Sequence, residues 1–455
     1  MRNLHNTFRA ALAAATCLTA AGTAMAQTTP APAAATPAPA ASPAAPPAGY
    51  WIDGIHLSAQ FQGGVTANPA SPQLNTGHSF TDRANQAMLN QVLLGAEKKL
   101  DPKATGVDWG FKILAMYGSD ARYTHYLGLL DQAVPKSERN QLDIVEASAS
   151  LHLPVSIFEG GLDLKAGLYA TPLGAETIDP SGNPFYSHSY IFNYALPFKH
   201  TGGFATIHAT ALLDLYIGVD TGSNTTFGSS GENNNSVAGL LGFGLNMMDG
   251  NLTVLALTHF GPENASRAVN TVRPRQNANS YNRYYNDIVV VWKANGKLTV
   301  TGEATLARDD FGANGFTGRP APANAFGMAG YLAYTLTDTI TLNARAEVFR
   351  DDNGFFVALA PGNYDPVYAQ KGIGAPLNTG VAVPAATYGS LTLGLTWKPE
   401  VPKPITSLAI RPEIRIDQSL GGNAVFNRSY NPARRVYQFY DTTAVTIGAD
   451  VVLTF

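Results

Sequence analysis

Apolar and polar residues alternate with a period of two along most of this chain, in segments of about 10 to 14 residues. In residues 298–306, which read LTVTGEATL, every second position is apolar or small. A tilted β-strand of this length can cross a bilayer with one face toward lipid. We therefore predict about sixteen strands, within a range of about 14 to 18. They lie near residues 53–65, 85–98, 106–119, 140–153, 160–171, 201–208, 211–220, 236–247, 250–260, 283–294, 297–309, 325–336, 339–350, 386–398, 405–418 and 440–455.

The connections between these segments alternate in length. Short turns such as Asn295-Gly296 and Thr337-Asp338 alternate with long connections such as 66–84, 171–200 and 351–385. An outer-membrane barrel has short turns on the periplasmic side and long loops outside. The sequence therefore predicts an all-β fold, namely a transmembrane antiparallel up-and-down β-barrel with both its N- and C-termini in the periplasm.

Aromatic residues mark the predicted short-turn end. All four tryptophans lie next to a short turn or the first strand: Trp51, Trp109, Trp292 and Trp397. Such a row is typical of the aromatic girdle at a membrane interface. The last strand ends on Phe455, which belongs to its apolar stripe, and this ending resembles the signal that outer-membrane assembly machinery recognises.

In a barrel of this size the apolar stripe faces lipid and the polar stripe lines a wide, wet lumen. The predicted lumen wall carries charges of both signs, at Lys112, Asp163, Lys165, Glu303, Arg345, Glu347, Arg411, Glu413, Arg415 and Asp417. The segment 411–417 is the densest part of this wall. Its charges are interpreted equally well as a field that sorts solutes in a pore or as a salt-bridged ladder that stiffens the wall.

The connection 171–200 is long and unusually aromatic for a loop. Long loops without secondary structure of their own tend to be functional. We interpret it as a loop that folds into the barrel and narrows the channel; the alternative is an outer cap or a subunit contact. The residues that we assign to this constriction are Asn183, Tyr186, His188, Tyr190, Phe192, Tyr194 and His200.

Two motifs carry a resemblance to a known family. The loop contains Asn183-Pro184, Ser187-His188-Ser189-Tyr190, Pro197-Phe198 and His200-Thr201-Gly202, and Arg411-Pro412-Glu413-Ile414-Arg415-Ile416-Asp417 occurs later in the chain. Together they resemble the OmpL-like β-barrel porin-2 family of Gram-negative outer membranes, over about residues 50–455. The resemblance implies a diffusion pore for small solutes and supplies no substrate.

The first 49 residues read as two segments that precede the barrel. Residues 1–26 have a basic start, an Ala-rich apolar stretch and Ala24-Met25-Ala26, which fits a signal-peptide cleavage site. Residues 27–49 are almost wholly Ala, Pro, Thr and Ser, a composition typical of an extended, disordered linker. The barrel domain is therefore predicted at residues 50–455, exported to the bacterial outer membrane.

Composition excludes several functional classes. Cleavage after Ala26 would change the balance from 30 basic and 33 acidic residues to 28 and 33, a net charge of about −5, which argues against nucleic-acid binding. The single cysteine, Cys17, lies in the predicted signal peptide, so disulfides and cysteine chemistry are excluded from the mature protein. His188 and His200 share the aromatic loop, yet without Glu-x-x-His spacing we assign them hydrogen-bonding roles and predict no metal and no cofactor.

The sequence thus predicts a porin, not an enzyme, through which small hydrophilic solutes diffuse passively. Its further expected partners are outer-membrane lipid and lipopolysaccharide, and a homotrimer by analogy with other porins of this strand number. The acidic pairs Asp309-Asp310 and Asp351-Asp352 at strand ends are candidates for Ca²⁺ or lipopolysaccharide cations, although solvated loop acids are the more ordinary interpretation.

Two alternative functions remain open. One is an outer-membrane hydrolase, for which His152 and His208 have no recognisable nucleophile in the sequence. The other is a structural or adhesive barrel with a plugged lumen.

Overall fold

The computed structural model describes residues 54–101, 104–130, 138–226, 236–264, 266, 269, 275–312, 321–359, 381–434 and 436–455. The predicted signal peptide, the predicted linker and Trp51 lie outside the described residues. The described residues form the barrel and its connections.

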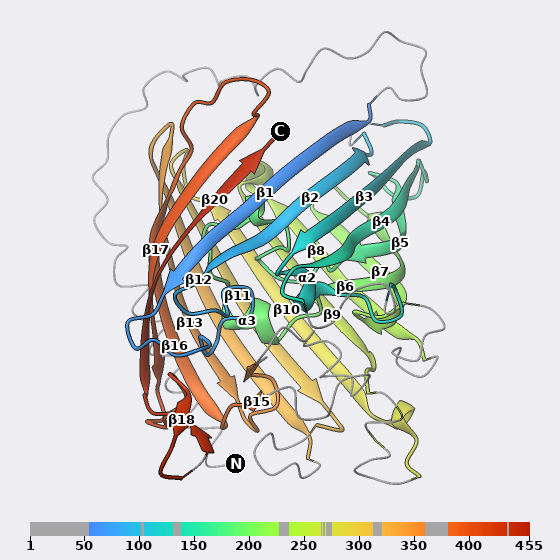
Figure 1. Ribbon diagram of the computed structural model, residues 1–455. Helices are drawn as coiled ribbons and strands as arrows, with labels where there is room; N and C mark the ends of the chain where they lie inside the picture. Colours follow the sequence, from blue (N-terminus) through green and yellow to red (C-terminus); the bar gives the residue numbers. More distant parts are fainter. Residues whose placement is uncertain are drawn as a thin grey trace, which may run out of the picture. The chain divides into compact units, whose positions relative to one another are not determined.

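Sixteen strands form one closed antiparallel barrel (Figure 1). Each strand pairs with its neighbours along the chain, and β1 closes the ring by pairing with β20. The strands are β1 (His56–Ala67), β2 (Ala87–Lys98), β3 (Asp108–Gly118), β4 (Gln141–Leu153), β5 (Leu162–Ala170), β6 (Lys199–His208), β7 (Leu213–Ser223), β8 (Ala238–Met247), β9 (Leu252–Pro262), β10 (Asn282–Lys293), β11 (Leu298–Asp309), β12 (Ala323–Thr337), β13 (Ile340–Asp351), β16 (Ala386–Trp397), β17 (Ser407–Ser419) and β20 (Thr443–Thr454). The predicted all-β, antiparallel up-and-down barrel and its strand number are confirmed; the periplasmic position of the termini stays a prediction.

Long and short connections alternate around the ring, as the sequence predicts. Short turns such as 294–297 and 338–339 define one end of the barrel, here called the short-turn end, and the C-terminus lies there too (Figure 1). Long connections such as 68–86, 171–198 and 420–442 define the opposite, long-loop end. Two of the long connections contain small two-stranded antiparallel sheets, β14 (Ala358–Leu359) with β15 (Val381–Ala382) and β18 (Ser429–Asn431) with β19 (Val436–Gln438). The sequence pattern did not predict them, because strands this short carry no visible alternation.

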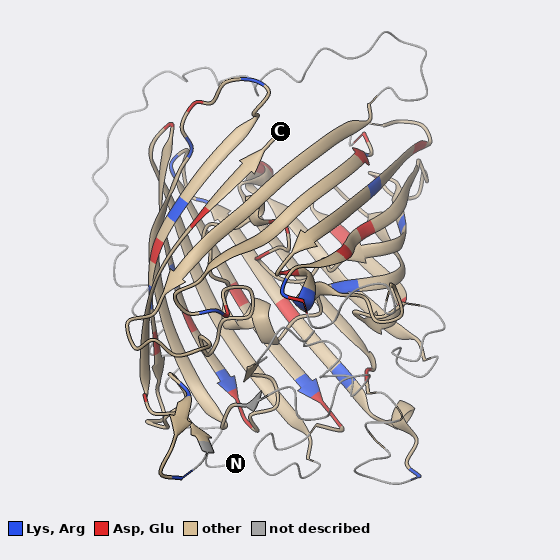
Figure 2. Ribbon diagram, viewed as in Figure 1, with Lys and Arg blue, Asp and Glu red and all other residues tan. Residues whose placement is uncertain are grey.

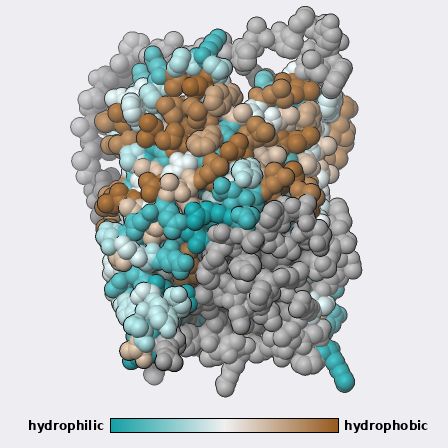
Figure 3. All heavy atoms as spheres, in the orientation of Figure 1, coloured by the Kyte–Doolittle hydropathy of each residue, from teal (hydrophilic) through white to brown (hydrophobic). Residues whose placement is uncertain are grey.

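The two faces of the barrel wall differ in chemistry. On β16 the outward Leu391 and Leu393 are 43% and 47% exposed, whereas the inward Ser390 and Thr392 are buried. The same division holds along β20, where Ile447 and Val451 are exposed on the outer face, and Phe455, directly after the strand, is exposed as well. Figure 3 shows apolar residues gathered on the outside toward the short-turn end, with polar residues closer to the long loops. The apolar stripe therefore faces outward, as expected for a wall in contact with lipid.

Helices occur only in connections among the described residues, and they are short. They are α2 (Ala121–Thr124), α3 (Tyr190–Tyr194) and the 3-10 turns η1 (Pro180–Gly182), η2 (Met248–Gly250) and η3 (Ala278–Ser280). None of these described helices has the length and apolar character required to cross a membrane.

Candidate functional site

The connection between β5 and β6, residues 171–198, turns into the barrel and lies against its inner wall; we call it the inner loop. Its helix α3 contacts β12 and β13 (Figure 1). Backbone N–H groups of the loop donate hydrogen bonds to carboxylates on the wall. These bonds run from Gly174 to Asp287 (2.9 Å), from Ala175 to Glu303 (3.0 Å), from Tyr186 and Ser187 to Glu413 (2.9 and 3.1 Å) and from Tyr190 to Glu347 (2.8 Å).

One ion pair anchors the middle of the inner loop. Arg345 on β13 donates to Glu176 Oε1 at 2.7 Å and to the carbonyl oxygen of Ser187 at 2.8 Å. Glu176 also accepts from Tyr331 at 3.2 Å and contacts His188 Nδ1 at 2.7 Å. Arg345 and Glu176 are both buried. Each of these buried charges requires its partner, because a buried charge left without a partner lowers the free energy of unfolding by several kcal/mol.

Two arginines of β17 bind the same loop through its carbonyl oxygens. Arg411 donates to the carbonyls of Pro180 (2.7 Å) and Asn183 (2.6 Å), and pairs with Asp450 on β20 at 2.9 Å. Arg415 donates to the carbonyl of His188 at 2.6 Å and pairs with Asp417 at 3.0 Å. Carbonyl oxygens are natural partners for guanidinium groups, which carry five donors. The dense charge cluster of strand β17 therefore contacts the loop rather than open solvent.

The loop also has local features that fix its own shape. The Asp179 side chain accepts from Ser181 N at the start of η1, and the Ser189 side chain accepts from Phe192 N (3.0 Å) at the start of α3. Both are favoured N-cap residues. Asn183 closes a smaller turn, because its amide group bonds the backbone N–H and carbonyl of Thr177 at 2.9 and 2.7 Å.

The aromatic residues of the inner loop take part in the packing of the lumen. Tyr190 stacks on Tyr388 and Phe349 of the wall, with centroids 4.7 and 5.8 Å apart. Phe192 stacks on His188 at 4.2 Å. Tyr186 and Phe192 are buried, and Tyr194 packs against the apolar cluster that contains Tyr190, Phe349 and Tyr388. These side chains hold the loop in place.

A second connection, residues 68–86, also enters the lumen. His78 lies 3.2 Å from Asp417, and Asn193 of the inner loop donates to the carbonyl of Gly77 at 3.2 Å. Burial, reinforced by the nearby Arg415 charge, lowers the pKa of His78, so its contact with Asp417 is that of a neutral imidazole at neutral pH. Nothing in the alternation pattern distinguishes this loop from the others, and the sequence did not reveal its role.

Charged side chains remain partly exposed on the opposite side of the lumen. Lys112 on β3 and Lys165 on β5 share the buried Glu146, at 3.6 and 2.6 Å. Asp163 contacts His152 Nδ1 at 2.6 Å. The lysines are 35% and 30% exposed and Asp163 is 31% exposed, whereas Glu303, Glu347, Glu413 and the arginines of β13 and β17 named above are buried. The predicted wall residues therefore divide into a group covered by the inner loop and a group that faces space.

A cavity of about 350 Å³ lies on the short-turn side of the inner loop. Loop residues Glu176 and Asn183 line it together with Tyr331, Thr396 and Arg411 from the wall. Charged residues are sparse on the strands overall (Figure 2). The lining of the cavity likewise has few charged side chains, such as Glu176 and Arg411, among uncharged residues such as Thr396.

The structure places all the predicted constriction residues except His200 in the inner loop, and it brings that loop to the predicted wall residues of β11, β13 and β17. His200 is the second residue of β6 rather than part of the loop, because the strand begins two residues earlier than predicted. It contacts Thr171, Asp220 and His259, away from His188. The sequence analysis did not predict that Glu176 and Asp450 pair with arginines of the wall. The position of Glu176, an acid in a loop predicted to fold against a wall rich in arginine, could have indicated its role.

The predicted acidic pairs at the long-loop end have protein partners. Asp309 pairs with Arg283 and Asp310 with Arg308, at 2.7 and 2.8 Å. Asp351 accepts from the backbone N–H groups of Phe356 and Val357, both at 2.9 Å. These acids therefore have hydrogen-bonding roles within the barrel wall and its loops.

We expect Glu176 to set the lower pH limit of the docked loop. Burial raises the pKa of its carboxyl, but the Arg345 charge and the His188 hydrogen bond together lower it from 4.5 to about 2. Because docking lowers this pKa, the ionised Glu176 carboxylate stabilises the docked loop. This stabilisation is complete above about pH 4.5 and is lost as the pH falls toward about 2. A spin label at the exposed Ser181→Cys should stay immobile down to about pH 4.5 and become mobile below it. The Glu176→Gln variant should lack this transition, and a transition near neutral pH would contradict the assignment.

Gly327 on β12 gives α3 the space to approach the wall. A methyl group at this position would overlap Cγ1 of Ile191. The substitution Gly327→Leu should therefore lower the free energy of unfolding by about 1–3 kcal/mol, as measured by denaturant titration in detergent. Gly330 on the same strand has no atom within 4 Å of such a group, so Gly330→Leu is the control. Equal losses in both variants would show that the contact with α3 is not the cause.

A closed sixteen-stranded barrel with an apolar outer face, a charged inner wall and a loop folded against that wall defines a membrane barrel of the porin type. The chain belongs to the family described as "Putative beta-barrel porin-2, OmpL-like", which it matches over residues 54–455. No curated protein matches the chain.

Solved structures share the fold at low sequence identity. The outer membrane channel DcaP of Acinetobacter baumannii is 9% identical, with a TM-score of 0.50 over 88% of this chain and 97% of that one. OmpF of Salmonella typhi, solved in complex with daunomycin, is 11% identical, with a TM-score of 0.50 over the same shares of the two chains. At such identities the likeness shows the fold alone.

Proposed function

We propose that this protein is a porin of the bacterial outer membrane, through which small hydrophilic solutes diffuse passively in a water-filled pore narrowed by the inner loop. The observation that carries the proposal is the division of the lumen. The inner loop is hydrogen-bonded to β1, β2, β10–β13, β16 and β17, whereas Lys112, Asp163 and Lys165 on β3 and β5 stay partly exposed to interior space. Solutes would pass between the loop and this exposed wall. No cofactor takes part, and no reaction is catalysed.

The same proposal includes the placement of the protein in the cell. Residues 1–26 would be cleaved on export, residues 27–49 would form a periplasmic linker, and both termini would lie in the periplasm. The last strand, ending at Phe455, would be recognised by outer-membrane assembly machinery. The exposed apolar outer face would contact lipid, with lipopolysaccharide around the long loops, and three copies would assemble as a homotrimer. The family membership and the outward apolar stripe support this placement.

Conductance in planar bilayers tests the proposal. The purified, folded barrel should produce stepwise current increments whose size grows with salt concentration. Liposome swelling with sugars, amino acids and organic anions then reports which solutes enter. A heat-modifiable and therefore folded barrel that produces no current steps would overturn the proposal.

The exposed lysines should influence ion selectivity. Lys112 and Lys165 face interior space and share one carboxylate, Glu146, so neutralising both lysines leaves a negative charge on this wall. We expect Lys112→Gln/Lys165→Gln to shift permeability severalfold toward cations, measured as the reversal potential in a salt gradient. The matched variant Arg411→Gln alters a buried, paired charge and should shift the reversal potential less. The reverse order would place the conduction path along β17.

A second function is favoured by one observation, the burial of the inner loop and of residues 68–86 within the long-loop half. His78, Tyr190 and Arg415 are almost wholly enclosed. Such packing is also what a structural barrel with a plugged lumen would have. The two functions differ in the bilayer experiment, since a plugged barrel conducts only after the inner loop is removed.

A further inference from the structure

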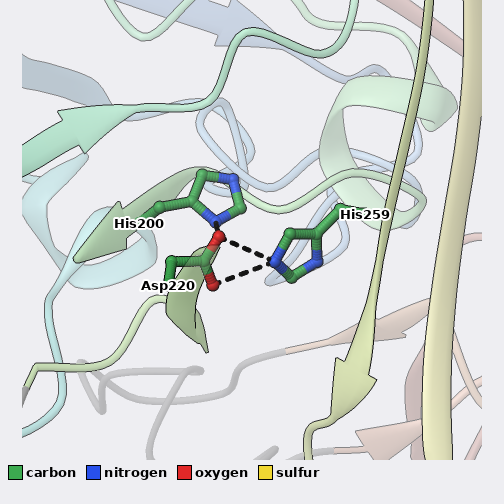
Figure 4. A group of neighbouring side chains, drawn as sticks. All are labelled: His200, Asp220 and His259. Carbon is green, nitrogen blue, oxygen red and sulfur yellow. Dashed lines mark hydrogen bonds and ion pairs between the residues drawn. The ribbon is translucent and has the colours of Figure 1, made fainter. Parts of the chain in front are cut away.

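Three buried side chains from three strands meet at one point near the long-loop end. His200 on β6, Asp220 on β7 and His259 on β9 converge, with both imidazoles turned toward one carboxylate (Figure 4). His259 Nε2 lies 3.0 and 3.1 Å from the two oxygens of Asp220, and His200 Nδ1 lies 3.3 Å from Asp220 Oδ2. All three side chains are at most 1% exposed.

The donor atoms match those that bind transition metals. Two imidazole nitrogens and one carboxylate oxygen are a common ligand set for Zn²⁺, and thiols are not required. Ligands at about 2.0–2.1 Å from a tetrahedral ion lie about 3.3 Å apart, close to the separations measured here. The three donor atoms lie within 4.8 Å of one another, so small side-chain rotations would complete the site.

The surroundings of this cluster resemble those of a metal site. The other ring nitrogen of His200, Nε2, lies 3.1 Å from the Thr171 hydroxyl, a contact that fixes the ring as outer partners of metal-binding histidines do. Within the described residues Asp220 forms no ion pair with a lysine or arginine. Tyr169 stacks on His200 with ring centroids 5.5 Å apart, and its buried hydroxyl has no hydrogen-bond partner among the described residues. A negative, enclosed pocket with a spare hydroxyl suits a divalent cation.

We propose that His200, Asp220 and His259 bind one divalent transition-metal ion, Zn²⁺ in the first place, inside the barrel wall. The ion would crosslink β6, β7 and β9. Through His200 and Thr171 it would also fix the point where the inner loop leaves β5, since Thr171 N donates to the carbonyl of Phe198 at 2.9 Å across the base of that loop. This site is independent of whether the barrel conducts solutes.

A catalytic interpretation of the same residues is weaker. Thr171, His200 and Asp220 are arranged as nucleophile, base and acid are in acyl-transfer enzymes. A substrate, however, needs a cavity beside the nucleophile, and the lumenal cavity includes none of these residues in its lining. A single ion needs no such cavity, which is why the observations favour the metal.

Metal analysis of the full chain, purified with a tag free of histidine and folded in the presence of Zn²⁺, tests the proposal. After removal of loosely bound metal with a chelator, we expect about one Zn²⁺ per chain. His200→Gln and His259→Gln should each retain less than about a tenth of that amount. His208→Gln is the matched control, because His208 also contacts aspartates, at 2.7 and 3.3 Å, but is partly exposed.

A measurement on the unaltered protein covers the case in which the variants fail to fold. X-ray absorption at the zinc edge should show nitrogen or oxygen ligands at about 2.0–2.1 Å with the outer scattering of two imidazoles. Absence of stably bound zinc, absence of imidazole scattering, or equal loss of zinc in His208→Gln would each overturn the proposal. Labelling of Thr171 by a fluorophosphonate in the metal-free chain would instead favour the hydrolase interpretation.

Discussion

Replacing Arg345 with methionine should release the inner loop from the barrel wall. The substitution removes the only charge that pairs with Glu176 among the described arginines and lysines, and it leaves the Ser187 carbonyl without its 2.8 Å partner. Breaking one side of a buried ion pair costs about 3–5 kcal/mol. The equilibrium constant for docking of the loop should therefore fall by roughly two to four orders of magnitude.

Hydrogen exchange followed by mass spectrometry measures this release directly. The N–H groups of Tyr186, Ser187 and Tyr190 bind wall carboxylates, so their protection reports docking. Protection in peptides covering residues 174–195 should fall strongly in Arg345→Met, while the strands stay protected. This readout does not depend on conduction.

Two variants show whether the effect comes from the buried pair. Arg350 lies on the same strand but pairs with Asp352 at a partly exposed position, so Arg350→Met should change stability by at most about 1 kcal/mol. The double variant Arg345→Met/Glu176→Gln removes both charges and should recover part of the protection. If Arg345→Met leaves the amides protected, the loop is held by its other contacts.

Removing residues 183–194 and joining the ends with a short glycine bridge should raise single-channel conductance severalfold. The deleted segment contains α3, the aromatic residues stacked in the lumen and the N–H groups that bind Glu413 and Glu347. Its removal leaves a lumen enclosed by sixteen strands, wide enough for water. Planar bilayer recordings of the intact and shortened barrels provide the measurement.

The control for this deletion is a loop segment outside the lumen. Hairpin β18–β19 carries the exposed Tyr430 and Tyr437, 50% and 53% exposed, so deleting residues 428–438 should leave conductance unchanged. Equal conductance in the intact barrel and in the 183–194 deletion would mean that the inner loop does not narrow the pore. Conductance in the deletion alone would identify the intact protein as a plugged barrel.

The amino-acid sequence by itself determined the wall of this protein. Alternation with a period of two placed all sixteen barrel strands, and the alternation of long and short connections predicted their order. Both are local properties, because each strand must present one face to lipid and the other to water wherever its neighbours lie. The outward position of Phe455 follows from the same rule.

Only the tertiary structure decided what the charged wall contacts. Arg345 meets Glu176, Arg411 meets the Pro180 carbonyl, and His259 meets Asp220, across separations along the chain that periodicity does not encode. These contacts depend on the path of the inner loop through the lumen and on the register between strands. An alternating pattern specifies which face a side chain occupies, but not its partner on that face, because partners inside a closed barrel are set by three-dimensional packing.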